Sequence, residues 1–197
     1  MTCPMTQWQN VPTAQLHMVP LCKVRRATAA DAAGILACLR AAFAPYEREY
    51  TPAAFRDTVL TPETILARLQ EMSVFVAVRG QNQIVGTIGC AVAFQSSDDP
   101  MNQSLNRGEG HIRGMAVLPA LQGKKTHGTS LAAELLRAAE AHLRSLACTR
   151  ATLDTTAPLQ RAIRFYQRNG YRASGRVSDF FGMPLYEYVK ELPPQSR

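Results

Sequence analysis

The stretch from His111 to Gly128 combines the residue types best suited to bind an anion. Residues 111–118 are β-rich and apolar and end at Pro119, and a short turn of glycine, lysine and threonine leads into a leucine-rich helical segment. This order brings the free backbone amides of a turn to a helix N-terminus, where the helix dipole also favours negative charge. Lys124 and Lys125 add positive charge. The pattern predicts a phosphate-binding loop.

The same loop is superficially similar to the end of a nucleotide-binding P-loop, through Gly123, Lys124, Lys125 and Thr126. A P-loop also needs a glycine five positions before its Gly-Lys pair and a Ser or Thr directly after it. Leu118 occupies the first of these positions and Lys125 the second. These two departures exclude a P-loop NTPase.

The composition indicates one globular domain with anionic partners. Of the 197 residues, 46% are hydrophobic and 19% charged, and the formal net charge is +7. A positive balance favours nucleic acid, a membrane surface or a phosphorylated small molecule. The basic residues are scattered without a run of five, so we expect neither a nucleic-acid nor a membrane partner.

The cysteines and histidines favour a metal-free protein of the cytoplasm. Five cysteines occur without a CxxC pair, and the four histidines have no further ligand at zinc spacing. No apolar run approaches the ~18 residues of a membrane span. We therefore predict reduced thiols, no metal site and a cytoplasmic location.

The periodicity of apolar residues predicts a mixed α/β domain. Residues 1–20 contain three prolines and no apolar period, and are expected to be a poorly ordered extension of a domain over 21–197. Strands are predicted over 21–26, 74–78, 84–94, 111–118, 151–154, 171–177 and 185–190, and helices over 28–44, from 61, over 131–146 and over 158–168. The order is β-α-α-β-β-β-α-β-α-β-β, which implies a mixed sheet of about seven strands with helices on both faces.

Several local signals mark these elements. Thr61 followed by Pro62 is typical of a helix start. Gly114 inside its strand indicates a bulge or a close approach of other backbone. Residues 44–60 are assigned to a short helix or a long loop, and 96–110 to an exposed loop. The apolar stripe of the long helix is expected to be Leu131, Leu135, Leu136, Ala139, Leu143 and Leu146.

Four motifs in a fixed order resemble the GNAT acetyltransferase family. The strand ending in Met115-Ala116-Val117, the proline two residues later, and Gln-Gly-Lys before a glycine and a helix resemble its motif A. The segments 25–31, 84–89 and 162–171 resemble its opening strand and helix, its third strand and its motif B. The resemblance runs from about residue 21 to 192. It implies a GNAT fold and an N-acetyltransferase with acetyl-CoA as cosubstrate.

The sequence departs from the family pattern at two places. Lys125 and His127 stand at the glycine positions of motif A, unless the loop has one extra residue and Gly128 is its last glycine. We prefer the second interpretation, since it places Leu131 where the first leucine of the helix belongs. In motif B, Leu159 replaces an asparagine that commonly contacts coenzyme A, and Gln160 is a candidate substitute.

The resemblance also implies roles for individual residues. Tyr166 matches the acid that protonates the departing thiolate, and His111 matches the position of a base in some members, with Glu109 as the alternative. The acyl thioester would lie along the strand and the phosphates on the loop, with the cofactor-binding residues Met115, Ala116, Val117, Gln122, Gly123, Lys124, Lys125, Thr126, His127, Gly128 and Thr129.

The acceptor is expected to be a small-molecule amine or a peptide N-terminus. Segments 44–60 and 95–109 would frame its pocket, with Glu47, Glu49, Asp98 and Asp99 attracting an ammonium and Tyr46, Tyr50 and Phe180 forming walls. Dimers are frequent in the family, so a homodimer is one expected assembly. The alternatives are an acyl-CoA-binding protein with little turnover, a longer acyl donor or, in a different class, a basic nucleic-acid-associated domain.

Overall fold

The computed structural model describes residues 22–93, 108–126 and 128–193. The predicted extension over 1–20, nearly all of the predicted 96–110 loop, and His127 lie outside these ranges. The strands of the main sheet are β1 (Cys22–Arg26), β2 (Ser73–Arg79), β3 (Gln83–Val92), β4 (Glu109–Val117), β7 (Arg150–Thr156), β8 (Arg172–Phe180) and β9 (Met183–Glu191). The helices are α1 (Ala32–Phe43), α2 (Pro52–Val59), α3 (Pro62–Glu71), α5 (Leu131–Ser145) and α6 (Gln160–Arg168).

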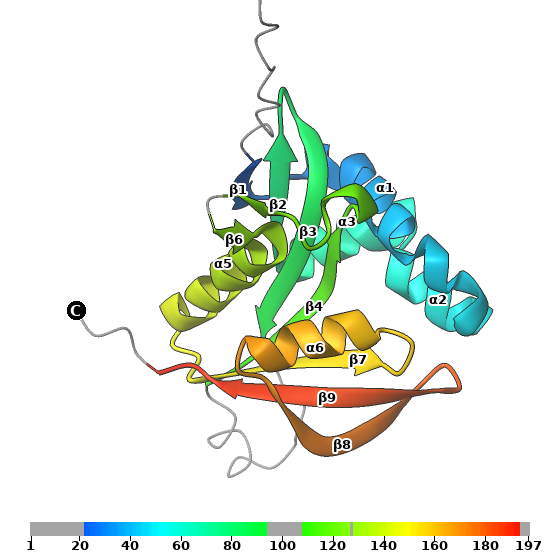
Figure 1. Cartoon of the computed structure of the whole chain (residues 1–197), viewed down its shortest axis with the longest axis vertical. Coiled ribbons are helices and arrows are strands. Elements are labelled where there is room, and N and C mark those ends of the chain that lie inside the picture. Colours follow the sequence, from blue (N-terminus) through cyan, green and yellow to red (C-terminus); the bar gives the residue numbers. More distant parts are fainter. Residues whose placement is uncertain (1–21, 94–107, 127, 194–197) are drawn as a thin grey trace, which may run out of the picture.

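The seven strands form one mixed sheet in the order β1-β2-β3-β4-β7-β9-β8 (Figure 1). Every neighbouring pair is antiparallel except β4 and β7, which run parallel. This parallel pairing joins only Glu109–Ile112 to Arg150–Leu153, whereas β4 stays paired with β3 as far as Val117. The sheet is therefore split along the later part of β4.

Helices cover both faces of the sheet, as predicted. Helix α5 packs on one face, with its leucines in a core that also contains Ile88, Ile112 and Leu153. Helices α1 and α3 pack on the other face, in a second core around Ile35, Ile65 and Val76. Figure 1 shows α5 on one side of β2 to β4 and α1 to α3 on the other.

The helix starts follow the predicted local chemistry. Thr61 accepts a hydrogen bond from the Thr64 amide and Pro62 occupies the first turn of α3, so the predicted start is confirmed. The predicted stripe of α5 is buried except at its last member, because Leu146 lies past the helix end and is 46% exposed. The prediction for Leu146 was wrong, since the chain turns toward β7 there.

The structure decides one prediction that was left open, in favour of helix, and two connections differ from prediction. Residues 44–60 form a short 3-10 helix (Ala44–Glu49) and then α2, which Thr51 caps through the Ala54 amide. Glu109 and Gly110 belong to β4 and not to a loop, because they pair with β7. The predicted phosphate-binding loop contains a small hairpin, β5 (Lys125–Thr126) and β6 (Thr129–Ser130).

The predicted bulge at Gly114 is present. Gly114 has φ +65°, in the region that glycine tolerates best, and the β3–β4 register shifts beside it. The shift changes which face the later side chains occupy: Ile112 and Val117 join the α5 core, and Ala116 joins the α1 core. The bulge thereby sets the positions of the residues on either side of the split. Within the described ranges, no helix is both long and apolar enough to span a membrane.

Candidate active site

A cavity of about 980 Å³ occupies the split between β4 and β7. Its lining comes from both strands, from α6, from the N-terminus of α5 and from the α1–α3 side of the sheet. Chain segments far apart in the sequence meet here because parallel strands β4 and β7 separate after four paired residues. The cavity is large enough for a ligand of drug size or more.

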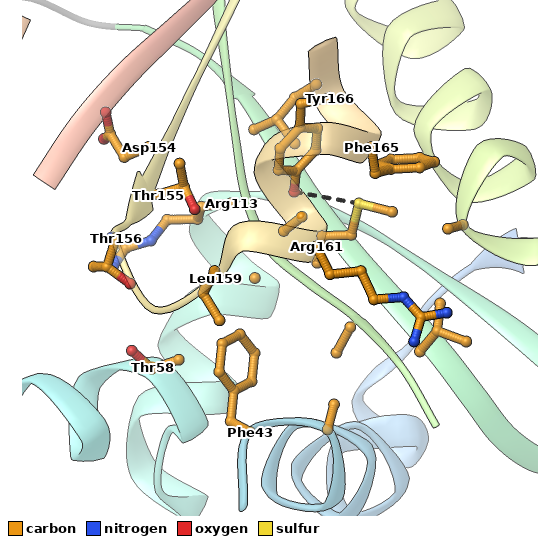
Figure 2. A pocket seen from close by; sticks show the side chains of 18 of the residues that line it. Phe43, Thr58, Arg113, Asp154, Thr155, Thr156, Leu159, Arg161, Phe165 and Tyr166 are labelled. Carbon is orange, nitrogen blue, oxygen red and sulfur yellow. Dashed lines mark hydrogen bonds between the residues drawn. The ribbon is translucent and has the colours of Figure 1, made fainter. Parts of the chain in front are cut away.

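Tyr166 and Met115 meet inside this cavity. Met115 lies on β4 beyond the split, and Tyr166 comes from α6; the phenol donates to the Met115 sulfur at 3.4 Å (Figure 2). Burial raises the pKa of the Tyr166 phenol well above its ordinary value. Tyr166 is therefore protonated over the whole physiological range and presents its proton at the open edge of β4.

His111 is held by Thr152 on the neighbouring strand. Its Nδ1 atom lies 3.1 Å from Thr152 Oγ1, and that hydroxyl donates its own proton to the Gly110 carbonyl. Because Thr152 Oγ1 can then only accept, we assign the imidazole proton to Nδ1 from this network. The lone pair is left on Nε2.

Asp154 faces that lone pair from β7. Its Oδ2 atom is 3.7 Å from His111 Nε2, and both residues line the cavity. Burial lowers the pKa of His111, opposed in part by Asp154, and burial likewise raises the pKa of Asp154. The net effect favours neutral imidazole near pH 7. Two hydrogen-bond acceptors then face each other with room for a donor.

The opposite end of the cavity is positively charged. The N-terminus of α5 lies there: Ser130 caps it through the Ala133 amide, and Ser130, Ala133 and Lys125 all belong to the lining. Arg161 reaches over from α6, and its Nη2 atom is 2.6 Å from where a Cβ on Gly123 would lie. Figure 2 shows Arg161 and Asp154 on opposite sides of the Tyr166–Met115 contact.

The cavity also contains polar groups suited to an elongated amide-bearing ligand such as coenzyme A. Thr155 lines the cavity, and its buried Oγ1 atom has no hydrogen-bond partner among the described residues. In the same part of the chain, the edge of β4 that faces away from β3 has no strand partner beyond Ile112. A buried orphan hydroxyl and a free strand edge both need partners, so the residues present fit a ligand with amide groups and phosphates.

The structure separates the predicted site residues into two groups. Within the cavity lining lie Tyr166, His111, Met115, Ala116, Val117, Gln122, Gly123, Lys125, Tyr46, Tyr50 and Phe180. Outside the lining lie Glu109, Lys124, Gly128, Thr129, Gln160, Glu47 and Glu49. His127, Asp98 and Asp99 fall outside the described residues.

Two of the residues outside the lining have other partners. Glu109 faces Arg150 at 3.5 Å, which leaves His111 as the better-placed candidate base. Gln160 donates to the Ala157 carbonyl at 2.8 Å, at the start of its own helix. Leu159, which replaces the family asparagine, lines the cavity (Figure 2).

Several charged residues of the cavity were missed by sequence reasoning. Among them are Asp154, Arg161, Arg113 and Arg68. Asp154 is the one carboxylate in a strand of alternating apolar and threonine residues. Arg68 follows the buried Ile65 by three positions, on the same side of its helix. Both patterns are visible in the sequence, but neither identifies a site by itself.

The mixed sheet, split beside a cavity with the N-terminus of α5 at one end, has the architecture of the GNAT fold. The profile of the Acetyltransferase (GNAT) family matches residues 36–171. The chain therefore belongs to this family, and the resemblance inferred from its motifs is confirmed. Among curated proteins, none matches the sequence significantly.

Solved structures share the fold at low sequence identity. The PaiA N-acetyltransferase from Thermoplasma acidophilum, in complex with coenzyme A, has a TM-score of 0.64 at 15% identity, over 87% of this chain and 99% of that one. YncA, a putative acetyltransferase from Salmonella typhimurium with its cofactor acetyl-CoA, has a TM-score of 0.63 at 19% identity, over 90% of this chain and 97% of that one. A putative phosphinothricin N-acetyltransferase has a TM-score of 0.64 at 14% identity, over 88% of this chain and 99% of that one.

Proposed function

We propose that the protein is an acetyl-CoA-dependent N-acetyltransferase that acetylates a primary amine by direct attack. Membership of the GNAT family supports acyl transfer. Coenzyme A and acetyl-CoA are bound by the similarly folded PaiA and YncA proteins. No cysteine is found among the described residues that line the cavity, which favours direct transfer over a thiol-bound acyl-enzyme.

The observation that carries the proposal is the facing pair of His111 Nε2 and Asp154 Oδ2 at 3.7 Å. Two acceptors at this separation leave a position for a group that donates hydrogen bonds to both. An ammonium is such a group, and the Asp154 carboxylate favours its positive charge. The amine must lose a proton before it can attack, and the free lone pair of neutral His111 accepts that proton.

Acetyl-CoA supplies the activated acetyl group as a thioester. The edge of β4 at Met115 to Val117 has no strand partner on the β7 side and would offer backbone groups to the acyl arm, although the Val117 carbonyl already accepts from Gln122 Nε2 at 2.9 Å. The Tyr166 hydroxyl, beside Met115, holds the proton that a departing thiolate requires. Lys125, Arg161 and the α5 N-terminus place positive charge where the phosphates would bind.

The test is an acceptor screen with the purified chain and acetyl-CoA, which measures release of the coenzyme A thiol and the mass of the product. We expect thiol release that depends on an amine, with intersecting initial-rate patterns. Tight binding of acetyl-CoA without release of the coenzyme A thiol in the presence of any amine would favour an acyl-CoA-binding protein. Parallel initial-rate patterns would contradict direct attack, and absence of acetyl-CoA binding would overturn the proposal.

A further inference from the structure

Arg68 is a charged side chain of the cavity for which the described residues supply no hydrogen-bond or ion-pair partner. It extends from α3 to the bulge of β4, where its Nη1 atom is 3.1 Å from the position that a Cβ on Gly114 would take. It is half-buried and lines the cavity. The neighbouring Arg113, in contrast, is paired with Asp57 at 2.8 Å.

The surroundings make the Arg68 charge unfavourable in the absence of a ligand. Burial and the nearby Arg113 charge lower the pKa of Arg68 to about 10, and Asp57 and Glu71 offset this only in part. At neutral pH the guanidinium still carries its charge, so its donor N–H groups lie at a half-buried site with no described carboxylate at ion-pair distance. An anion in the cavity would supply the missing partner.

The position of Arg68 argues against a role with the phosphates of coenzyme A. Helix α3 packs on the α1 face of the sheet, while Lys125 and the α5 N-terminus lie on the opposite face. Along β4, Gly114 is three residues from His111, or roughly 10 Å at the rise of a strand. The guanidinium thus lies a short molecule's length from the proposed amine position, on the acceptor side.

We propose that Arg68 binds an anionic group of the acceptor, so that the substrate is an amine that also carries a carboxylate or phosphonate. The planar guanidinium fork matches such groups through two parallel hydrogen bonds. The ammonium would lie between His111 and Asp154, and the anion would lie at Arg68. This inference rests on the proposed function and adds the substrate class to it.

The test uses matched acceptors that differ only in the anion: amino acids against their amides, and aminoalkylphosphonates of increasing length against simple alkylamines. Thiol release should show a kcat/KM roughly 10-fold or more higher for the anionic member of each pair. The variant Arg68→Gln should remove this preference by raising the acceptor KM about 10- to 100-fold, the usual effect of losing a charge-assisted pair. The Kd of acetyl-CoA should stay unchanged. Carboxylate and phosphonate series distinguish the two sources of the anion.

The control is Arg40→Gln, which changes an exposed arginine of α1 outside the cavity and should leave the preference intact. If Arg68 only stabilises the fold, Arg68→Gln should lower Tm and leave the acceptor preference unchanged. That result, or equal rates for both members of every pair, would overturn the inference while leaving the acetyltransferase function in place.

A binding measurement separates the two proposals. Calorimetric titration with the anionic amines, and with the same anions lacking the amine, should show saturable binding that Arg68→Gln weakens. Such binding without thiol release from any acceptor would refute the proposed function and retain the anion site. Absence of Arg68-dependent binding would refute the anion site whatever the activity.

Discussion

His111 Nε2 and Asp154 Oδ2 face each other at 3.7 Å across the only parallel strand pair of the described sheet. The network through Thr152 assigns the imidazole proton to Nδ1, so the unprotonated Nε2 atom is the one nearest the carboxylate. The parallel pairing of β4 and β7 ends directly beyond this point. The same pair of strands therefore positions the proposed base and opens the space in which its substrate would bind.

The pH dependence of kcat/KM should report the His111 pKa. Burial lowers that pKa below its ordinary value of 6.5, so the rate should rise with pH with a midpoint below that value, because only neutral imidazole accepts a proton. His111→Gln should reduce kcat by about 10²–10⁴-fold and remove this rise of kcat/KM with pH. The measurement is a pH series of initial rates with one acceptor, whose own ammonium pKa stays constant between variants.

Asp154→Asn should move the rise of kcat/KM to lower pH. The Asp154 charge raises the His111 pKa, so its removal lets burial lower that pKa further, and the acceptor KM should rise because the ammonium loses its carboxylate. A rise that stays in place or moves to higher pH would show that the two groups are not coupled. Asp179→Asn, which changes another carboxylate of the cavity lining, provides the comparison.

Tyr166→Phe should lower kcat by about 10²–10⁴ with little change in the KM for acetyl-CoA. The substitution removes only the hydroxyl that donates to Met115, and the ring still fills its place in the core. Tyr188→Phe is the matched control, since Tyr188 is equally buried but lies outside the cavity. Unchanged acetyl transfer by Tyr166→Phe across pH would exclude Tyr166 as the acid.

Arg161→Gln should raise the KM and Kd of acetyl-CoA by about 10-fold and leave the acceptor KM unchanged. Its guanidinium lies at Gly123 beside the α5 N-terminus, where it would add one charge-assisted contact to the phosphates. The effect should shrink at high salt because exposed charges are screened. Arg164→Gln is the control, since this exposed arginine of the same helix does not line the cavity; equal effects of both changes would indicate only a general loss of positive charge.

Asp31→Asn should lower the free energy of unfolding at pH 7 by about 1–2 kcal/mol. This value is smaller than the full pKa shift implies, because solvent screens the partly exposed Arg25. The Arg25 guanidinium, with the Thr28 amide, lowers the pKa of Asp31 from 3.8 to about 2. Because the folded-state pKa is the lower one, this stabilisation is present above the unfolded-state value and is lost as the pH falls through the folded-state value. Urea unfolding at pH 7 and pH 2.5 measures this effect. The difference in free energy of unfolding between wild type and Asp31→Asn should be smaller at pH 2.5, whereas the exposed control Glu71→Gln should show no such change.

Local signals predicted much of the architecture. The start of α3 at Thr61, the bulge at Gly114 and most of the α5 stripe depend on side chains a few residues apart, and the structure confirms them. Leu146 was predicted wrongly, and the segment 44–60 was left open between a short helix and a long loop, because both depend on where the chain must turn next. A hydrophobic period cannot report a helix end that a tertiary connection sets.

By itself the sequence determined the order of the seven strands of the main sheet and of four of the five described helices, the family, and the candidate groups for chemistry, His111 or Glu109 and Tyr166. Only the tertiary structure brought Asp154, Arg161 and Arg68 to one cavity, since they come from β7, α6 and α3. The spacing of residues along one segment reports the face of a helix or strand, but not which other element packs against it. The cavity itself exists because β4 and β7 separate after four paired residues, and that separation depends on strand pairing across the whole sheet.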